Sequence, residues 1–148
     1  MAEKKKIRFS RKRERIWEWI RSREDHPRAE DIYQALRQEF PDLSLGTVYK
    51  NLHFLEDQGR ISRVRGPLGT ERFDWRTGDH NHFICRECGM IRDLDLPEDP
   101  AAGLSSETAD GGHIEAVTLT AVGLCGECRK KLAEKALTAD PAEAGGQN

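Results

Sequence analysis

The sequence of 148 residues lacks any apolar run that approaches the roughly 20 residues of a membrane-spanning helix. Its basic N-terminal segment, "MAEKKKIRFSRKRERI", lacks the apolar stretch of a secretory signal. We find no internal repeat, and 34% of the residues are charged. These absences argue against a membrane-spanning or secreted protein and predict a soluble, cytoplasmic one.

Cysteine is also scarce, and its four copies form two Cys-x-x-Cys pairs, Cys85 with Cys88 and Cys125 with Cys128. In a cytoplasmic chain such pairs are metal ligands more often than disulfides. Two Cys-x-x-Cys turns can complete a tetrahedron of thiolates around zinc, and a site closed in this way is structural because it has no open position. An iron–sulfur cluster and a thiol redox pair remain alternatives.

The chain lacks a strong net charge, but its formal charge of -2 hides an asymmetry. Residues 1–77 carry 18 Lys and Arg against 13 Asp and Glu, whereas residues 78–148 carry 6 against 13. A basic half joined to an acidic half favours a nucleic-acid-binding unit followed by a unit with another task. A solvated, lysine-rich terminus is the alternative.

The basic half has the pattern of a winged helix-turn-helix. Helical spacing of apolar residues predicts helices over 11–23 and 25–40, and a third that starts after the N-cap Ser44 and stops at Gly59. The stretch "RISRVRGPLGTERFDW" then predicts a hairpin. In such a fold the third helix lies in the major groove of DNA.

If Val48, Leu52 and Leu55 face inward, the outward face of the third helix carries the side chains predicted to contact DNA: Thr47, Tyr49, Lys50 and Asn51. A hydroxyl, a phenol, an ammonium and an amide suit phosphates and base edges. An ordinary solvated helix face is the alternative.

The acidic half predicts a small α/β unit. "HFIC", "MIRDLDL" and residues 113–125 have strand character, and "GECRKKLAEKAL" predicts a closing helix. We therefore expect an α+β protein, with a winged-helix DNA-binding domain over 1–77 and a metal-binding domain over 78–137, built on a three-stranded antiparallel sheet. Residues 97–112 are ambiguous, and the tail 138–148 has the composition of a disordered segment.

Histidines and carboxylates suggest a second metal site. His80 and His82 are two apart on one strand and so point to the same face. Asp74 ends the predicted hairpin, six residues before His80, and Asp93 lies on the predicted strand next to the one that carries the histidines. Nitrogen and oxygen ligands of this kind suit Fe(II), Mn(II) or Zn(II). Such residues are also common without a metal.

Together the stretches "HPRAEDIYQAL", "TVYKNLHFLEDQG", "RFD", "HNHFICRECG" and "CGEC" resemble the ferric uptake regulator family of bacterial metal-dependent repressors. The resemblance covers about residues 10–135. It implies a homodimer with an N-terminal winged-helix domain and a C-terminal dimerisation domain. It also implies a structural zinc at Cys85, Cys88, Cys125 and Cys128, and a regulatory Fe(II) or Mn(II) at His26, Asp74, His80, His82 and Asp93. The role of His26 comes from the resemblance alone.

The resemblance is strongest to the peroxide-responsive branch, whose members carry aspartate at the position of Asp74, where iron-sensing members often carry glutamate. Pro100 and Val117 stand where iron-sensing members have an acid and a histidine of a further site. Arg28 and Lys50 depart from the family's usual residues.

The resemblance therefore implies a non-enzymatic repressor of a palindromic DNA operator that senses hydrogen peroxide through Fe(II)-catalysed oxidation of His26 or His80. An iron-responsive repressor is the alternative. A non-haem Fe(II) oxygenase is a third reading, but it does not need the basic half, and no apolar stretch suggests a pocket for an organic substrate.

Overall fold

The computed structural model describes residues 8–66 and 69–139. The predicted disordered tail lies outside these residues except for Thr138 and Ala139, and Thr138 is the last residue of a helix. The tip of the predicted hairpin, residues 67–68, also lies outside them.

Three helices form the N-terminal bundle: α1 (Arg11–Arg21), α2 (Ala29–Leu36) and α3 (Leu45–Asp57). The predicted N-cap of α3 is confirmed, because the hydroxyl of Ser44 accepts a hydrogen bond from the backbone N–H of Thr47 at 3.1 Å. The predicted stop is confirmed as well, since Gly59 adopts a φ of 66° just beyond the helix. The helices bury one apolar core, formed by Ile16, Ile20, Ala29, Ile32, Leu36, Phe40, Leu43, Val48, Leu52, Leu55, Ile61 and Phe73.

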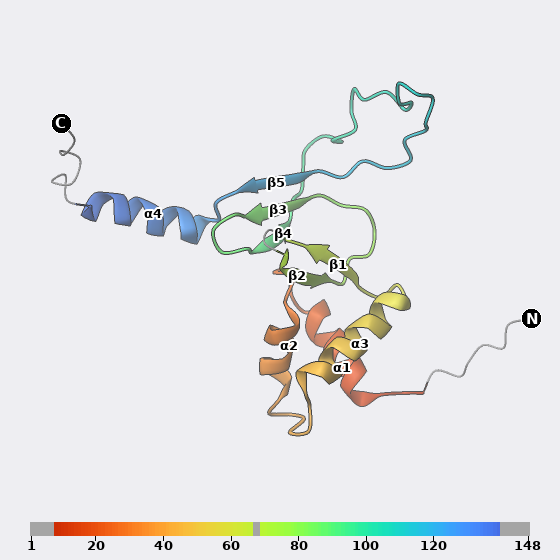
Figure 1. Ribbon diagram of the computed structural model, residues 1–148, viewed down its shortest axis with the longest axis vertical. Coiled ribbons are helices and arrows are strands. Elements are labelled where there is room, and N and C mark those ends of the chain that lie inside the picture. The colour runs from red at the N-terminus through yellow and green to blue at the C-terminus, as the bar shows by residue number, and fades with distance from the viewer. Residues whose placement is uncertain (1–7, 67–68, 140–148) are drawn as a thin grey trace, which may run out of the picture.

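The predicted hairpin follows the helices and is formed by β1 (Ser62–Arg65) and β2 (Glu71–Asp74). The two strands pair antiparallel, with Ser62 opposite Asp74. Phe73 of β2 is fully buried and closes the helical core from above. Helices, turn, helix and hairpin thus stand in the order of a winged helix (Figure 1).

A second sheet contains β3 (His82–Cys85), β4 (Ile91–Asp93) and β5 (Thr120–Gly123), in the order β4-β3-β5. Strand β4 is antiparallel to β3, but β5 is parallel to it. The expectation of an antiparallel sheet was therefore wrong for β5. Alternation in a sequence indicates a strand but not its direction, and the long segment between β4 and β5 allows the chain to return in either direction.

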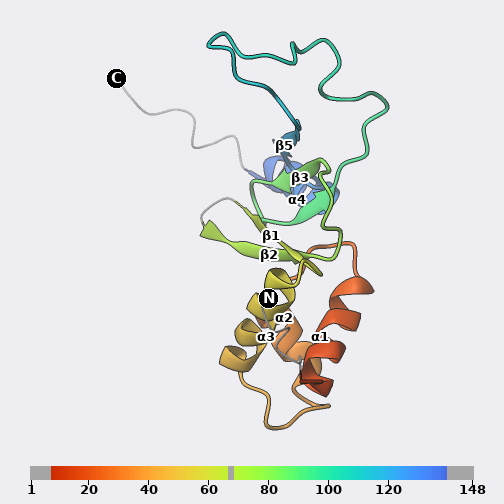
Figure 2. The same ribbon diagram turned by 90° about the vertical axis from the view of Figure 1, so that its right-hand side faces the viewer.

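The third predicted strand is also shorter than expected. Of residues 113–125 only Thr120–Gly123 form a strand, and His113 makes a single bridge with Glu107. The connection 94–119 projects from the sheet on one side, and helix α4 (Gly126–Thr138) projects on another (Figures 1 and 2). Cys128 is the buried residue of α4. None of the described helices is long and apolar enough to cross a membrane.

Candidate metal centres and nucleic-acid interface

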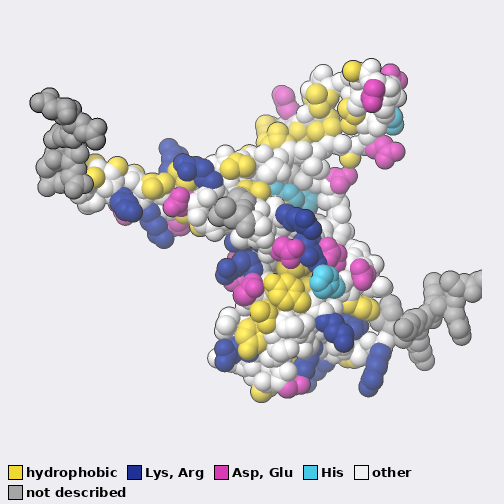
Figure 3. All heavy atoms as spheres, viewed as in Figure 1, with side chains coloured by type: hydrophobic (Ala, Val, Ile, Leu, Met, Phe, Trp, Pro, Cys, Tyr) yellow, Lys and Arg dark blue, Asp and Glu magenta, His cyan; other side chains and the backbone are white. Residues whose placement is uncertain are grey.

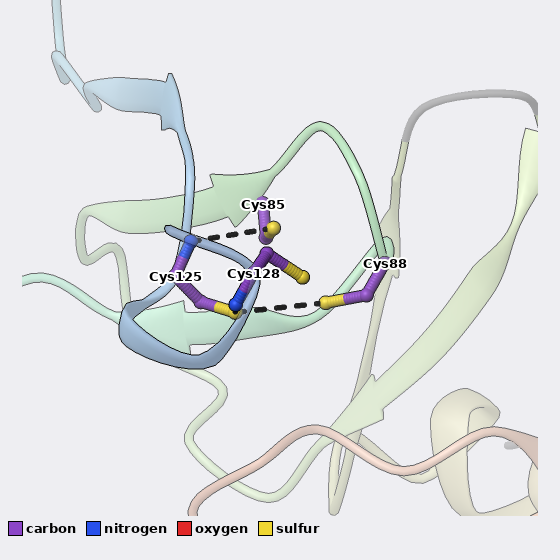
Figure 4. Close-up of side chains that lie close together, drawn as sticks. All are labelled: Cys85, Cys88, Cys125 and Cys128. Carbon is purple, nitrogen blue, oxygen red and sulfur yellow. Dashed lines mark hydrogen bonds between the residues drawn. The ribbon is translucent and has the colours of Figure 1, made fainter. Parts of the chain in front are cut away.

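The four cysteines converge from two turns. Cys85 ends β3 and Cys88 lies in the turn toward β4, whereas Cys125 caps α4 and Cys128 lies in its first turn. All four are free thiols, and their sulfur atoms lie within 4.8 Å of one another. Figure 4 shows the four side chains pointing toward a common centre.

The spacing of the sulfur atoms fits a tetrahedral zinc. Zinc–sulfur bonds of about 2.3 Å place neighbouring sulfurs roughly 3.8 Å apart, and the sulfurs of Cys88 and Cys125 are 3.9 Å apart. Burial raises the pKa of the Cys85 thiol, but hydrogen bonds from the N–H groups of Cys88, Cys125 and Glu87 outweigh it and lower the pKa to about 6. The hydrogen bond with Cys125, together with burial, raises the pKa of Cys128 to about 12. Such a cluster holds several thiolates at neutral pH only when a cation neutralises them.

A second cluster joins the helical half to the second sheet. His26 lies between α1 and α2 and Asp74 ends β2, whereas His80 and His82 lie before and within β3 and Asp93 ends β4. Each of these residues offers one atom to a group whose members lie within 4.8 Å of one another. Pairing of β3 with β4 places His82 directly opposite Asp93. The structure thus brings together all five residues that the resemblance implied.

The distances in this cluster fit a six-coordinate divalent ion, whose bonds of about 2.1 Å place adjacent ligand atoms roughly 3 Å apart. Asp74 Oδ2 lies 3.0 Å from His26 Nε2 and 2.7 Å from His80 Nε2. Asp93 Oδ1 lies 3.0 Å from both of these nitrogens. His82 Nε2 is farther out, at 3.6 Å from Asp74 Oδ2.

Three of these atoms are buried without a well-aligned hydrogen bond, namely His80 Nε2, His82 Nε2 and Asp93 Oδ1. They belong to the group of ligand atoms that lie within 4.8 Å of one another. Buried polar atoms left in this way are costly unless a ligand satisfies them. The nitrogen and oxygen donors suit Fe(II) or Mn(II).

Backbone carbonyls orient two of the rings. His80 Nδ1 lies 2.7 Å from the carbonyl of Gly78, and His26 Nδ1 lies 3.2 Å from the carbonyl of Glu24. A carbonyl can only accept, so Nδ1 carries the proton and the lone pair of Nε2 faces the cluster. Both histidines are therefore set in the tautomer that binds a metal.

His26 is held in a strained backbone conformation. Its φ of 47° lies in the left-handed region, which for a residue other than glycine costs about 1–3 kcal/mol. The guanidinium of Arg72 donates to its carbonyl at 3.1 Å, and the N–H of Phe73 donates to the carbonyl of Pro27 at 3.0 Å. These bonds to β2 fix the loop that presents the buried ring.

Charges in the cluster shift its pKa values in a consistent pattern. Burial alone would raise the pKa of Asp74, but the contact with the protonated form of His26 and the hydrogen bond from the Arg76 N–H lower it to about 2. In that form His26 carries a proton on both ring nitrogens, and a bound metal would displace the one on Nε2. Burial opposes the charge of His26, yet the hydrogen bond to Asp74 leaves its pKa raised. Burial, together with His80 and His26, lowers the pKa of His82. The carboxylate is thus ionised, as a ligand must be.

Sequence reasoning missed two arginines at this cluster. Arg72 supports the His26 loop, and Arg76 places its Nη1 2.6 Å from Asp93 Oδ2. One signal was present for Arg72, which lies two residues before Asp74 on β2 and so shares a face with it. Arg76 lies beyond the strand, and its position does not follow from this alternation. A cavity of about 480 Å³ opens beside the cluster, with His26, Asp74, Arg76, Arg92 and Asp93 in its lining.

The predicted DNA-contacting side chains of α3 differ in their accessibility. Lys50 is exposed, whereas Thr47 and Tyr49 are half-buried. The Tyr49 hydroxyl donates to Glu30 of α2 at 3.3 Å. Asn51 was expected to point outward, and that expectation was wrong, because it is only 8% exposed and its amide donates to the carbonyl of Thr47 at 2.9 Å. The buried face of α3, which contains Val48, Leu52 and Leu55, is wide enough to include Asn51.

Comparison with known proteins gives consistent matches. The family described as "Ferric uptake regulator family" matches residues 4–121. The peroxide operon regulator of Bacillus subtilis (strain 168) is 34% identical over 125 residues, covering 84% of this chain and 86% of that protein. The peroxide-responsive repressor PerR of Staphylococcus epidermidis is 33% identical over 126 residues, covering 84% and 83%.

Solved structures match as well. The Helicobacter pylori ferric uptake regulator Fur aligns with a TM-score of 0.71 at 24% identity, covering 83% of each chain, which concerns the fold alone. The Campylobacter jejuni peroxide stress regulator aligns with a TM-score of 0.62 at 27% identity, covering 79% of this chain and 88% of that one. The family match spans most of the sequence, and both candidate clusters have the geometry of metal centres. This chain belongs to the ferric uptake regulator family of metal-dependent transcriptional regulators.

Proposed function

We propose that this protein is a DNA-binding repressor that senses hydrogen peroxide through a regulatory Fe(II) site. One observation carries the proposal: five nitrogen and oxygen donors, including aspartate at position 74, converge between the helical half and the second sheet. The similarity to relatives named as a peroxide operon regulator and a peroxide-responsive repressor supports this branch.

The regulatory site would connect two domains, a DNA-binding domain over residues 1–77 and a dimerisation domain over residues 78–137. His26 and Asp74 belong to the first, and His80, His82 and Asp93 to the second. Residues that hold one ion from both sides fix the angle between the domains. Only one such angle lets both α3 helices of a homodimer meet successive major grooves of a palindromic operator.

The apolar surface of the second half supports the proposed homodimer. Leu104, Leu119, Val122, Leu132 and Leu137 are all exposed in the monomer, Val122 to 63%. Figure 3 shows apolar side chains gathered along β5 and part of the 94–119 connection. Exposed apolar surface of this kind marks an interface more often than it faces water.

The sensing chemistry depends on the histidines. Fe(II) held by the five residues would supply the electron that reduces hydrogen peroxide beside the imidazole rings, whereas Mn(II) reduces peroxide poorly. A ring carbon of His26 or His80 then gains one oxygen atom. In net balance, one hydrogen peroxide is consumed, one water is released and the ring is oxidised by two electrons. The oxidised ring is a poorer donor, so the domains are no longer held at the DNA-binding angle.

The proposal requires that the second site, and not zinc alone, controls DNA binding. We suggest selecting duplexes from a random-sequence pool with zinc-loaded protein, with and without Mn(II), and then measuring affinity for the selected duplex. Mn(II) should enrich a palindrome and strengthen its binding, and His82→Ala should abolish the effect while zinc content stays the same. Equal binding with and without Mn(II) would favour a zinc-only DNA-binding protein. Failure to select any duplex would favour an enzyme of the oxygenase class.

A further inference from the structure

Arg76 hydrogen-bonds to both carboxylates of the second cluster, which is formed by His26, Asp74, His80, His82 and Asp93 and is called the regulatory cluster below. The backbone N–H of Arg76 donates to Asp74 Oδ1 at 2.8 Å. The guanidinium of Arg76 donates to Asp93 Oδ2 at 2.6 Å. Arg76 follows the end of β2, so a single residue of the first half contacts the outer oxygen of an aspartate from each half.

The inner oxygens are the ones that face the histidines. All the close contacts of the imidazole Nε2 atoms are made with Asp74 Oδ2 and Asp93 Oδ1. Asp93 Oδ1 is buried and has no aligned hydrogen bond, whereas Oδ2 is occupied by Arg76. Each aspartate therefore turns one oxygen toward the histidines, where a metal would bind, and has the other oxygen engaged by Arg76.

This division of the oxygens determines how many donors the cluster offers. A carboxylate can bind a divalent ion through one oxygen or through both. With each outer oxygen engaged by Arg76, the five residues offer five atoms, which leaves one position of an octahedral ion for a small ligand. Asp93 is the less constrained of the two, since its side chain is 24% exposed against 3% for Asp74. Without the guanidinium, Asp93 has room to turn both oxygens inward.

A cavity beside the cluster is large enough to admit such a ligand. Its volume is about 480 Å³, and its lining includes Arg76 together with the ligand residues His26, Asp74 and Asp93. A hydrogen peroxide molecule is far smaller than this space. The residue that holds Asp93 therefore also lines this cavity.

We propose that Arg76 is a positioning residue that keeps Asp93 bound to the regulatory metal through one oxygen and so keeps a coordination position open for hydrogen peroxide. The idea rests on the proposed function, because it describes the same site. Under this proposal Arg76 is required for a small ligand to reach the metal, but it is not required for the protein to bind the metal. The Arg76–Asp93 pair contributes little to folding, because an ion pair with a 43% exposed guanidinium is screened by water.

The test uses zinc-loaded protein with one Mn(II) per chain, and the water-proton relaxivity of the bound Mn(II) as its readout. Relaxivity rises when a water molecule exchanges at an open position of the ion. We expect high relaxivity in the wild type, loss of most of it in Arg76→Gln, and recovery in Arg76→Lys, whose ammonium can still reach Asp93. A residue with only a structural role would change the melting temperature but would not show this recovery.

The matched control is Arg92→Gln, which removes the same charge from the same cavity. Arg92 is exposed and forms no ion pair in the part of the chain that the structure describes. This variant should keep the wild-type relaxivity and Mn(II) affinity. Arg76→Gln should bind Mn(II) at least as tightly as Arg92→Gln, because its Asp93 gains a second oxygen for the ion.

Several outcomes would overturn the inference: low relaxivity in the wild type, unchanged relaxivity in Arg76→Gln, or loss of its Mn(II) binding. Failure of the proposed function looks different. If Fe(II)-loaded wild type resists peroxide while Arg76→Gln still loses relaxivity, peroxide sensing is wrong and the role of Arg76 stands. If the peroxide-sensing function and the role of Arg76 are both correct, Fe(II)-loaded Arg76→Gln should also be oxidised by peroxide more slowly than Fe(II)-loaded Arg92→Gln.

Discussion

At the residue scale, metal binding at the regulatory cluster depends on the orientation of the histidine Nε2 atoms. Carbonyl groups of Glu24 and Gly78 fix the proton on Nδ1 of two imidazoles, so that both Nε2 atoms face the cluster without rearrangement. The backbone of His26, whose ring lies in the cluster, has a positive φ. The strain is tolerated because bonds from Arg72 and Phe73 hold the loop on both sides of Pro27.

This strain gives a prediction about stability. In most places glycine destabilises a protein relative to alanine. At position 26 we expect the reverse, with His26→Gly more stable than His26→Ala by about 1 kcal/mol, because alanine pays the left-handed penalty and glycine does not. Urea denaturation of both zinc-loaded variants, without Fe(II) or Mn(II), measures the difference. The same exchange at exposed Ala133 of α4 should favour alanine, and an alanine preference at position 26 would show that the loop relaxes.

At the element scale, the four cysteines connect the β3–β4 turn to the start of α4. The second half has little apolar core of its own, with Ile84 and Ile91 as its buried aliphatic side chains among the described residues. Zinc would therefore replace much of the missing hydrophobic stabilisation.

We expect Cys85→Ser to lose zinc and the folded second half together, and with it the homodimer. Zinc analysis and analytical ultracentrifugation measure the two effects on one sample. Glu87→Gln, an exposed change in the same turn, should keep one zinc per chain and the dimer. A dimeric Cys85→Ser without zinc would contradict a structural role for the metal.

The elements themselves were predictable to different degrees. The caps of α3 and the hairpin of β1 and β2 follow from local signals, Ser44, Gly59 and two short alternating runs. The direction of β5 does not follow from local signals. It depends on how the long connection 94–119 returns the chain to β3, and not on the residues of β5 itself. Among the regulatory donors, the His80–His82 spacing was visible in the sequence, whereas the position of His26 depends on a tertiary contact with β2.

At the scale of the whole molecule, the proposal links metal binding to the presentation of two α3 helices. Lys50 is the exposed cation on α3 among the four side chains predicted to contact DNA, and buried Asn51 no longer belongs to that group. Tyr49 is held by Glu30, which keeps its ring beside α2. If α3 enters the major groove as proposed, we expect Lys50 to make the main phosphate contact of this group.

Lys50→Ala should weaken binding of the Mn(II)-loaded protein to the selected duplex and leave metal content unchanged. Because each protomer of the proposed homodimer loses one phosphate contact, the slope of log affinity against log salt should become shallower by about 2 per dimer. Fluorescence anisotropy over a range of salt concentrations measures both quantities. Lys130→Ala, on α4, is the matched control and should leave the affinity and the slope unchanged. An unchanged slope for Lys50→Ala would show that another surface contacts the DNA.

The central claim is that peroxide acts on the histidines of the regulatory site. Peptide mass spectrometry of the zinc- and Fe(II)-loaded protein after low-dose hydrogen peroxide tests it most directly. The account predicts one added oxygen on His26 or His80, intact cysteines, and no such change in the Mn(II)-loaded protein. Unmodified histidines with oxidised cysteines and lost DNA binding would contradict it, and unmodified histidines with DNA binding retained would instead identify an iron-responsive repressor.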